Sequence, residues 1–537
     1  MFRFARQRDG TGHQNVSMAV RSYNAVVIKG GFVRIAVRRL EADFEKLILE
    51  DERGSVEMAR KRTRQDSPDR MFGVEIRHGF RGRLAATLTS FVMACFAVVV
   101  SAADLTERQE ESAARGWELL RSKPYLPPDF DDAVFENLWK VWEPEARDRA
   151  AKATPEERRQ MTFSRYGLME VPNEPDAKTA LGYVSVEDGG WAMNCLACHG
   201  GKVAGRVVPG LGNSHTALQS LTEDVRLTKL SQFKSLSHLD LATLKLPLST
   251  THGTTNSVIF GVVLGNLRDR DMNVDRSRPA PPLTHHDMDA PPLWNVRFKQ
   301  YLYADAFAPK NSRVLMQFML LPENGPEKLR EWQSDFAGIL AWIESLEPPR
   351  WPFEIDRSLA DSGRVVFNEH CVACHGSYGP EGEYPERVIP LAEIGTDPVR
   401  LRALTTEHRQ WMREGWMSHY GRDHVEVDPV GYVAPPLHGI WASAPYFHNG
   451  SVPTLWHVLH PAERPTVWKR TEDGYDQQRV GLEVQTFDKV PEDARTPWQK
   501  RGYFDTTKPA KSNAGHTFPE KLTEQQKTAV LEYLKTL

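Results

Sequence analysis

The sequence predicts a mainly α-helical protein of two lobes with long irregular loops and little β-structure. Helical periodicity recurs along the chain, whereas alternating strand patterns are scarce. The helical segments are 105–121, 130–160, 326–346, 357–370, 398–416 and 522–536. The chain also contains 37 glycines and 36 prolines, which are typical of loops between helices. A proline-rich break, "SLEPPRWPFEID" at 345–356, divides the chain into lobes over 104–348 and 349–537.

The first hundred residues show a different pattern. Arg77, Arg81 and Arg83 precede an uncharged run over 84–103 that ends in the small residues "VVVSAAD". This order is typical of a secretory signal peptide over 71–103, and residues 1–70 are then an upstream extension from a mis-called start. A retained anchor is the alternative, because 20 apolar residues just span a bilayer. If the signal peptide is cleaved, the mature protein is not expected to insert stably into a membrane.

The net charge of the predicted mature chain excludes some classes of binding partner. Residues 1–70 carry 15 Arg and Lys against 10 Asp and Glu, and without them and the signal segment the net charge is −10. An acidic mature chain argues against nucleic acid and anionic membrane surfaces as partners.

Four cysteines remain after signal cleavage, and all four lie in two copies of one motif. "NCLACHGG" contains Cys195, Cys198 and His199, and "HCVACHG" contains Cys371, Cys374 and His375. Cys-x-x-Cys-His is the attachment motif of haem c, in which the thiols add to the haem vinyl groups and the adjacent histidine ligates iron. The sequence thus predicts two covalently bound haem c groups, with His199 and His375 as proximal ligands.

Zinc and disulfides are the competing interpretations of these cysteines. A four-ligand zinc site pairs its Cys-x-x-Cys halves over a short span, whereas 176 residues separate these two motifs. Disulfides suit an exported protein, but they do not account for the histidine that follows each pair. Haem attachment accounts for all six residues, and each lobe is then expected to be a cytochrome c-like helical haem lobe.

Two further segments carry a family resemblance. The run "APPLHGIWASAPYFHNGSVPTL" at 434–455 and the run "DAPPLWNVRFKQYLYADAF" at 289–307 resemble segments of the bacterial dihaem cytochrome c peroxidase superfamily. No methionine follows the "PTL" turn, which reads "PTLWHVLHPAERP". The late "NAGHTF", together with "NCLACHGGKVAG" and "PGLGN", is similar to the haem-containing rubber oxygenase branch.

The resemblance to this branch implies an asymmetry between the two haems. It implies that His516 is the sixth ligand of the haem held by His375, with His448, His457 and His460 as rivals. An iron capped on both faces transfers electrons, whereas an open face binds oxygen or peroxide. Chemistry is then expected at the haem of His199, which the apolar segments 257–266 and 291–295 would keep dry.

Two aromatic residues are expected to serve this first haem. By the resemblance, Trp294 lies between the haems beside the reactive one, and Phe307 lines its pocket. Core packing is the alternative for both. Arg422 and Arg464 are candidates to neutralise haem propionates.

Three functions stay open at this point. The first is O2-dependent oxidative cleavage of an apolar, polyisoprene-like substrate at the first haem. The second is a peroxidase that reduces H2O2 with electrons from a small redox protein, for which His252, His285, His286 and Glu223 are candidate proton donors. The third is a non-enzymatic electron carrier. Each implies a periplasmic or secreted bacterial protein, because haem c is attached outside the cytoplasm.

Overall fold

The computed structural model describes residues 7–8, 14–15, 106–278 and 284–537, in two units over 1–94 and 95–537. In the first unit, β1 (Gln7–Arg8) pairs antiparallel with β2 (Gln14–Asn15). The predicted signal segment 71–103 lies outside the described residues. Within the described ranges, no helix combines the length and apolar character needed to cross a bilayer.

The predicted fold class is wrong in its account of the β-structure. The described part of the second unit contains five small antiparallel sheets, and two cytochrome c-like helical lobes are not evident in it. The sheets are β3 (Phe130–Asp131), β5 (Gly190–Met193) and β4 (Tyr183–Ser185); β6 (Gly200–Val203) and β7 (Arg206–Pro209); β8 (Tyr301–Leu302) and β9 (Ala308–Pro309); β10 (Val388–Pro390) and β11 (Gly431–Val433); and β13 (Gly481–Phe487), β12 (Val467–Asp476) and β14 (Phe504–Asp505). Most of these strands are too short for an alternating pattern to register in the sequence.

The helices are short and numerous. In the first half they are a helix over 106–122, α3 (Asp132–Phe135), η1 (Leu138–Val141), α4 (Pro144–Lys152), α5 (Pro155–Tyr166), η2 (Glu187–Gly189), α6 (Leu196–His199), α7 (Leu218–Ser231), α8 (His238–Ala242), α9 (Ser257–Asn266), η3 (Leu293–Phe298), α10 (Ser312–Leu315), η4 (Met316–Met319), α11 (Pro326–Glu331) and α12 (Gln333–Ser345). In the second half they are α13 (Arg357–His370), α14 (Val372–His375), α15 (Leu391–Ile394), α16 (Val399–Ala403), α17 (Thr406–Glu414), η5 (Trp416–Ser418), η6 (Ile440–Ala442), α18 (Leu455–Leu459), η7 (Pro461–Glu463), α19 (Pro497–Arg501), η8 (Phe518–Lys521) and α20 (Glu524–Leu534).

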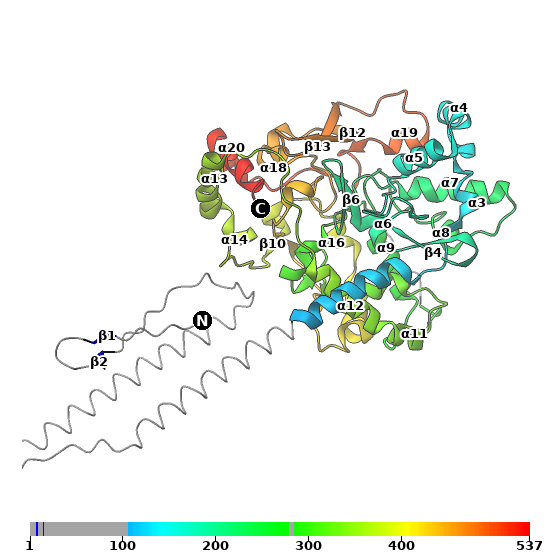
Figure 1. The fold of residues 1–537 in the computed structure, drawn as a ribbon, viewed down its shortest axis with the longest axis horizontal. Helices are drawn as coiled ribbons and strands as arrows, with labels where there is room; N and C mark the ends of the chain where they lie inside the picture. The colour runs from blue at the N-terminus through cyan, green and yellow to red at the C-terminus, as the bar shows by residue number, and fades with distance from the viewer. Residues whose placement is uncertain (1–6, 9–13, 16–105, 279–283) are drawn as a thin grey trace, which may run out of the picture. The chain divides into compact units, whose positions relative to one another are not determined.

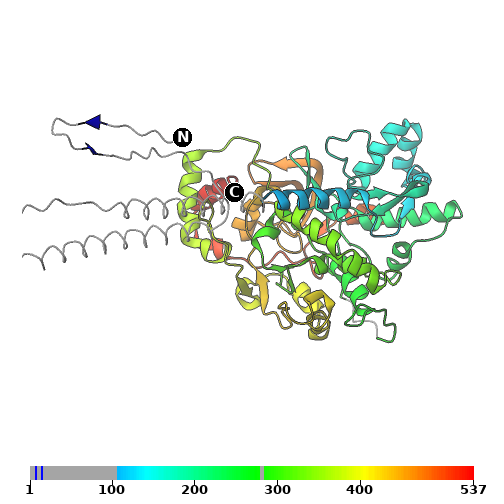
Figure 2. The ribbon, with the colours of Figure 1, turned by 60° about the horizontal axis from the view of Figure 1, so that its bottom comes forward.

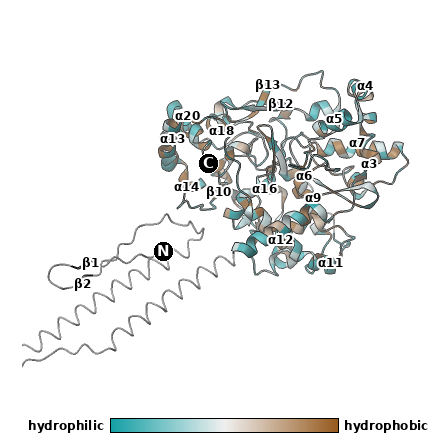
Figure 3. Ribbon diagram, in the orientation of Figure 1, coloured by the Kyte–Doolittle hydropathy of each residue, from teal (hydrophilic) through white to brown (hydrophobic). Residues whose placement is uncertain are grey.

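The helix pair α13 and α20 lies side by side and supports the second motif (Figure 1). Ala360, Gly363 and Phe367 are the buried positions of α13, at helical spacing, and most of its other positions are polar (Figure 3). A Cβ at Gly363 would lie 1.9 Å from the Ala529 carbonyl oxygen, so glycine permits the close approach of the two helices. Cys371 follows directly at the end of α13, which fixes where the motif begins.

The helix over 106–122 packs against α12 in the same way (Figure 2). A Cβ at Gly116 would lie 2.0 Å from the Gly338 carbonyl oxygen. The pair belongs to a core cluster that also contains Trp416 and Met417, from beyond the expected boundary at 348/349. The boundary stays a prediction, although residues from both sides share this cluster.

Candidate functional site

The first Cys-x-x-Cys-His motif forms the short helix α6. Asn194 accepts a hydrogen bond from the Leu196 N–H at 2.8 Å and starts the turn. His199 Nδ1 lies 3.0 Å from the Pro291 carbonyl oxygen. A carbonyl only accepts hydrogen bonds, so Nδ1 carries the proton and Nε2 keeps the lone pair that a metal needs. Burial lowers the pKa of His199 to about 4, which keeps the imidazole neutral and able to ligate.

The loop "PGLGN" connects this motif to the segment that contains Pro291. The Gly210 N–H donates to the His199 carbonyl oxygen at 2.7 Å, and the Leu293 N–H donates to the Gly210 carbonyl oxygen at 2.7 Å. A Cβ at Gly212 would lie 1.8 Å from the Ala290 carbonyl oxygen. The glycines therefore allow three backbone segments to meet directly behind the histidine.

The second motif repeats this arrangement. His375, at the end of α14, has its Nδ1 2.9 Å from the Pro435 carbonyl oxygen. Tyr378 donates its hydroxyl to the His375 carbonyl oxygen at 2.9 Å and accepts from the Leu437 N–H at 2.7 Å. The second imidazole is thus oriented like the first, with Nε2 left for a metal.

The two proline acceptors occupy equivalent positions in a repeated tetrapeptide. Ala-Pro-Pro-Leu occurs at 290–293 and again at 434–437, and each histidine contacts the first proline of its copy. The repeated tetrapeptide is the sequence signal that pairs each motif with its acceptor.

The two tetrapeptide segments also contact each other. Trp294, which is fully buried, donates its Nε1–H to the His438 carbonyl oxygen at 2.7 Å. Asn295 donates its side-chain amide to the Pro436 carbonyl oxygen at 3.1 Å. Trp294 therefore lies between the segments that orient the two histidines.

His516 faces His375, and the spacing of their rings is informative. The ring centroids are 6.2 Å apart and the planes are inclined by 63°. Two imidazoles that bind one iron from opposite faces place their centroids roughly 6 Å apart, because each metal–nitrogen bond is about 2 Å long. The His516 ring makes no hydrogen bond within the described part of the chain, and its buried Nδ1 has no partner there. The pair fits a bis-histidine haem.

The rival ligands are less suitable. His460 is engaged at both nitrogens, by the Trp456 carbonyl oxygen at 2.9 Å and by Glu524 at 2.8 Å. His457 is engaged at Nδ1 by Thr454 at 2.7 Å. The ring of His448 stacks on Tyr432, with centroids 4.3 Å apart.

The surroundings of His199 differ from those of His375. Among the described residues, no other ring contacts the His199 imidazole in the way that His516 faces His375. Thr255 is hydrogen-bonded to Cys198, so the apolar helix α9 begins beside the first motif. Within α9 the apolar residues between Val258 and Leu264 are only half-buried, apart from Ile259 and Gly261.

Phe307, the second predicted pocket residue, lies in the hydrophobic core. It is buried and belongs to the cluster that contains Leu196, the residue after Cys195. The Arg409 guanidinium lies 5.0 Å from its ring centroid, and Tyr303 packs at 5.8 Å. The structure thus places Phe307 in the core cluster that includes part of the first motif, and it does not show that Phe307 contacts a ligand.

The predicted proton donors are mostly engaged elsewhere. Glu223 pairs with Arg501 at 2.6 Å, which lowers the pKa of its carboxyl group against the effect of burial. His285 lies 2.9 Å from Asp287. His252 is 3.2 Å from the Ser220 hydroxyl, and burial lowers its pKa to about 3. Each of these three side chains therefore already has a partner within the protein.

Some buried polar atoms of the described residues have no protein partner. They are the Nε and Nη1 atoms of Arg400, which are donors, and His286 Nε2, which is an acceptor because His286 Nδ1 donates to the Thr284 carbonyl oxygen at 2.8 Å. Burial lowers the pKa of His286 and of His448, and the charge of Arg400 lowers both further, so Arg400 lies near both imidazoles. A buried carboxylate, such as a haem propionate, would satisfy the two Arg400 donors.

The four cysteines fit haem attachment better than the competing chemistries. All four are free thiols rather than disulfides. No group of three or more potential ligands gathers into a metal site in the described ranges. Burial raises the pKa of Cys195, Cys198 and Cys371 to about 11. Together with the paired histidines, the donor set fits two covalently held haems.

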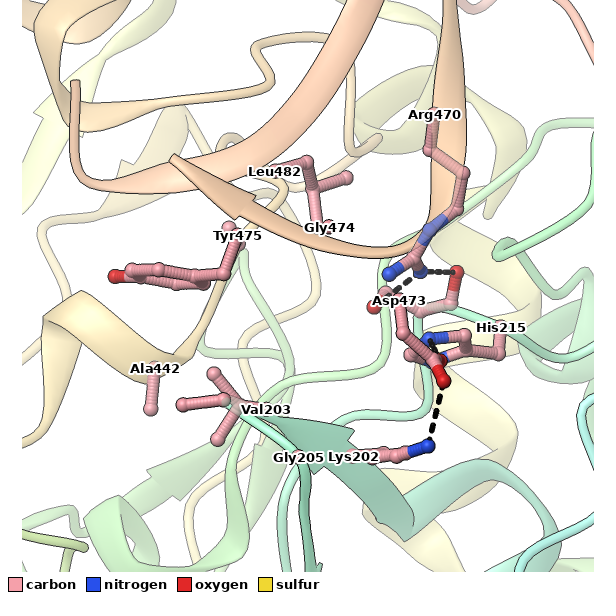
Figure 4. A pocket seen from close by; sticks show the side chains of 13 residues that line it. Lys202, Val203, Gly205, His215, Ala442, Arg470, Asp473, Gly474, Tyr475 and Leu482 are labelled. Carbon is pink, nitrogen blue, oxygen red and sulfur yellow. Dashed lines mark hydrogen bonds and ion pairs between the residues drawn. The ribbon is translucent and has the colours of Figure 1, made fainter. Parts of the chain in front are cut away.

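A small pocket lies near the first motif, where β12 approaches β6 (Figure 4). Lys202 donates to Asp473 at 2.7 Å, and His215 Nε2 lies 3.4 Å from the same carboxylate. Arg470 donates to the Ser214 carbonyl oxygen at 2.7 Å. Lys202 and His215 face the Asp473 carboxylate while Arg470 binds Ser214, so these contacts tie the β12–β13 hairpin to the strand after His199.

Comparisons with known proteins support a cytochrome c in part of the chain. Residues 431–469 match a family model described as RoxA-like, cytochrome c-like. A protein of Sinorhizobium fredii (strain NBRC 101917 / NGR234) described as uncharacterized protein y4iJ is 30% identical, over 36% of this chain and 41% of the relative. A second from that organism, uncharacterized protein y4iM, is 31% identical, over 27% of this chain and 38% of the relative. The chain spans less than half the length of each of these relatives.

Proposed function

We propose that this protein is an extracytoplasmic dihaem c-type cytochrome in which the first haem is reactive and the second exchanges electrons. Cys195 and Cys198 would hold the first haem, with His199 as its ligand. Cys371 and Cys374 would hold the second, between His375 and His516. The observation that carries the proposal is the 6.2 Å pairing of His375 with His516, for which His199 has no equivalent among the described residues.

The haems, when bound, supply O2 binding at an open iron and one-electron exchange at a capped one. The chain's own residues prepare both sites. Pro291 and Pro435 accept from Nδ1 of the two histidines and fix their tautomer and orientation. Such an acceptor also raises the basicity of the ligating nitrogen. The two proximal sides are therefore alike, and the difference in function arises on the opposite faces.

Trp294 supports electron exchange between the sites. Its indole is hydrogen-bonded to the backbone of the second tetrapeptide at 2.7 Å and follows directly after the first. A bonded path runs from His199 through Pro291 and the backbone to Trp294, across its hydrogen bond to His438, and back along the chain to Pro435 and His375. An indole in this place shortens the path that an electron must travel between the two histidines.

The apolar surroundings of the first motif support an apolar substrate. Helix α9 begins next to Cys198, and its half-buried side chains are aliphatic or aromatic. We propose cleavage of a carbon–carbon double bond in a polyisoprene-like chain, in which both atoms of O2 end in the two carbonyl products. This reaction needs no proton donor, in agreement with the engagement of Glu223, His252 and His285.

Oxygen uptake tests this reaction. Dispersed polyisoprene should stimulate O2 consumption by the purified dihaem protein and yield products with carbonyl ends. A matched assay with H2O2 and a reduced small cytochrome should show no comparable turnover. Rapid peroxide turnover without O2 uptake would reject the oxygenase in favour of a peroxidase, and neither activity would leave an electron carrier.

A further inference from the structure

Arg464 is a half-buried arginine that donates hydrogen bonds to backbone carbonyls. It lies in the segment after α18, and no ion pair joins it to a carboxylate in the described part of the chain. The acceptors are the carbonyl oxygens of Asn513 at 2.7 Å, Gly515 at 2.7 Å, His457 at 2.9 Å, Val458 at 3.4 Å and His516 at 3.5 Å. Its guanidinium therefore joins α18 to the loop that contains His516.

This loop has an unfavourable backbone that needs external support. Gly515 has φ +81° and His516 has φ +49°, so two successive residues are left-handed, and the second is not glycine. The His516 N–H donates to the Ile394 carbonyl oxygen at 2.7 Å on one side. Arg464 holds the carbonyls on the other side, so the loop is fixed between α15 and α18.

The geometry of the Arg464 guanidinium suits it to hold the backbone carbonyls of the His516 loop. One planar fork donates Nη1 to two carbonyls of the loop and Nε to a carbonyl of α18. Burial lowers the pKa of Arg464 to about 10, which leaves it charged at neutral pH. The Phe447 ring lies 4.8 Å from the guanidinium and also contacts the His516 ring, at 6.1 Å. These contacts correct the expectation that Arg464 pairs with a propionate.

We propose that Arg464 is a positioning residue that holds His516 on the iron of the second haem. The inference rests on the proposed function, since it presupposes that His516 is the sixth ligand. Without the fork, the loop would relax from its left-handed backbone and the imidazole would leave the metal for part of the time. The second haem would then bind external ligands that the native protein excludes.

The test compares CO binding by four holoproteins: wild type, His516→Ala, Arg464→Gln and Arg470→Gln. Arg470 is the matched control, because it is also half-buried, also donates to a backbone carbonyl, and also has its pKa lowered by desolvation to about 10. It makes no contact with the His516 loop. Ferric spectra report the low-spin bis-histidine haem, and CO titration of the reduced proteins counts open irons.

We expect about one CO per wild-type protein and about two for His516→Ala. Arg464→Gln should give an intermediate value, with at least a tenfold rise in the five-coordinate fraction of the second haem, whereas Arg470→Gln should match wild type. Arg464→Lys, which keeps the charge without the fork, should restore only part of the low-spin signal.

Two failures are distinguishable. If His516→Ala leaves the CO count unchanged, His516 is not the ligand and the proposed function loses its basis. If His516→Ala behaves as expected but Arg464→Gln matches Arg470→Gln, only the positioning role is overturned. Should Arg464→Gln fail to fold, Gly515→Ala tests the same loop with Arg464 intact. Its Cβ would lie 2.3 Å from the Gly395 backbone, so a low-spin signal equal to wild type would then contradict the proposal.

Discussion

The two Cys-x-x-Cys-His motifs share one side of their geometry and differ on the other. His199 and His375 each place Nδ1 against the first proline carbonyl of an Ala-Pro-Pro-Leu segment, at 3.0 and 2.9 Å. Among the described residues, His375 faces a second imidazole, that of His516, at a ring spacing of 6.2 Å, and His199 does not. The two motifs thus share the proline carbonyl that orients each histidine. They differ in the residue that faces the imidazole, and this difference would give the two haems different functions.

Removal of the first haem should have the largest effect. Cys195→Ala with Cys198→Ala eliminates both thioether bonds, because no other free thiol lies in the motif. The haem content should fall from about two to about one per protein, and substrate oxidation should be lost. Pyridine haemochrome absorbance and protein mass measure the haem count.

The matched pair of substitutions at the second motif, Cys371→Ala with Cys374→Ala, completes this comparison. It should also remove one haem but leave CO binding at the first. Equal CO binding in the two double variants would show that the haems do not differ as proposed.

The next largest effect should come from His516→Ala, which makes the two motifs alike. The second iron should lose its low-spin signal and bind CO, since the imidazole opposite His375 is gone. His457→Ala is the control, because that ring is hydrogen-bonded to Thr454 and lies in the same region. Loss of the low-spin signal in His457→Ala alone would transfer the ligand role to it.

Part of the fold could be predicted from the sequence. The periodic segment 357–370 coincides with α13. The doubled motif predicts haem attachment at four cysteines and two proximal histidines, and this assignment stays a prediction. Asp356 caps that helix, and Thr523 with Gln526 forms a capping box before α20, both local signals.

The remainder depends on long-range contacts that leave no local pattern. The acceptor of His199 is 92 residues away and that of His375 is 60 residues away. Strands such as β8, of two residues, pair only because the tertiary fold brings them together. Arg464 was expected at a propionate, since nothing in the sequence reveals that its partners are carbonyls.

Trp294→Phe should have an intermediate effect. It should slow electron transfer between the two haems and leave the ligands of each haem unchanged. The phenyl ring keeps most of the buried volume but loses the hydrogen bond to the His438 carbonyl, at a cost of about 1 kcal/mol in stability. Electron transfer between the haems should slow by about tenfold or more, an order-of-magnitude expectation that corresponds to about 1.4 kcal/mol in the barrier.

Trp441→Phe is the control for that measurement. Trp441 is equally buried and donates its Nε1–H to the Pro349 carbonyl oxygen at 3.0 Å, away from the two tetrapeptides. Flash photolysis of the half-reduced CO complex follows the transfer. Equal slowing in both variants would indicate general loosening rather than a specific path.

Acid should have the smallest effect at working pH, and it should act near both motifs. Burial lowers the pKa of His252 to about 3 and that of His438 to about 4, below the ordinary value near 6.5. Between pH 6.5 and about 4 the unfolded chain therefore binds more protons than the folded one. Stability should be complete above pH 7 and should fall as the pH decreases through this window.

Thermal midpoints at pH 7, 6 and 5 measure this dependence, and His252→Gln should make it less steep. His252 contacts Trp498 and Ser220 rather than a cysteine motif, so its substitution should leave the haem spectra unchanged. A pH profile as steep as that of wild type would contradict the assignment of His252 as a buried neutral imidazole.

The most direct test of the central claim is a count of open irons in the unmodified protein. Reduced wild-type protein should bind about one CO for every two haems, and its ferric magnetic resonance spectrum should contain one bis-histidine low-spin signal. Two bound CO molecules, or none, would contradict the asymmetry between His199 and His375 on which the account depends.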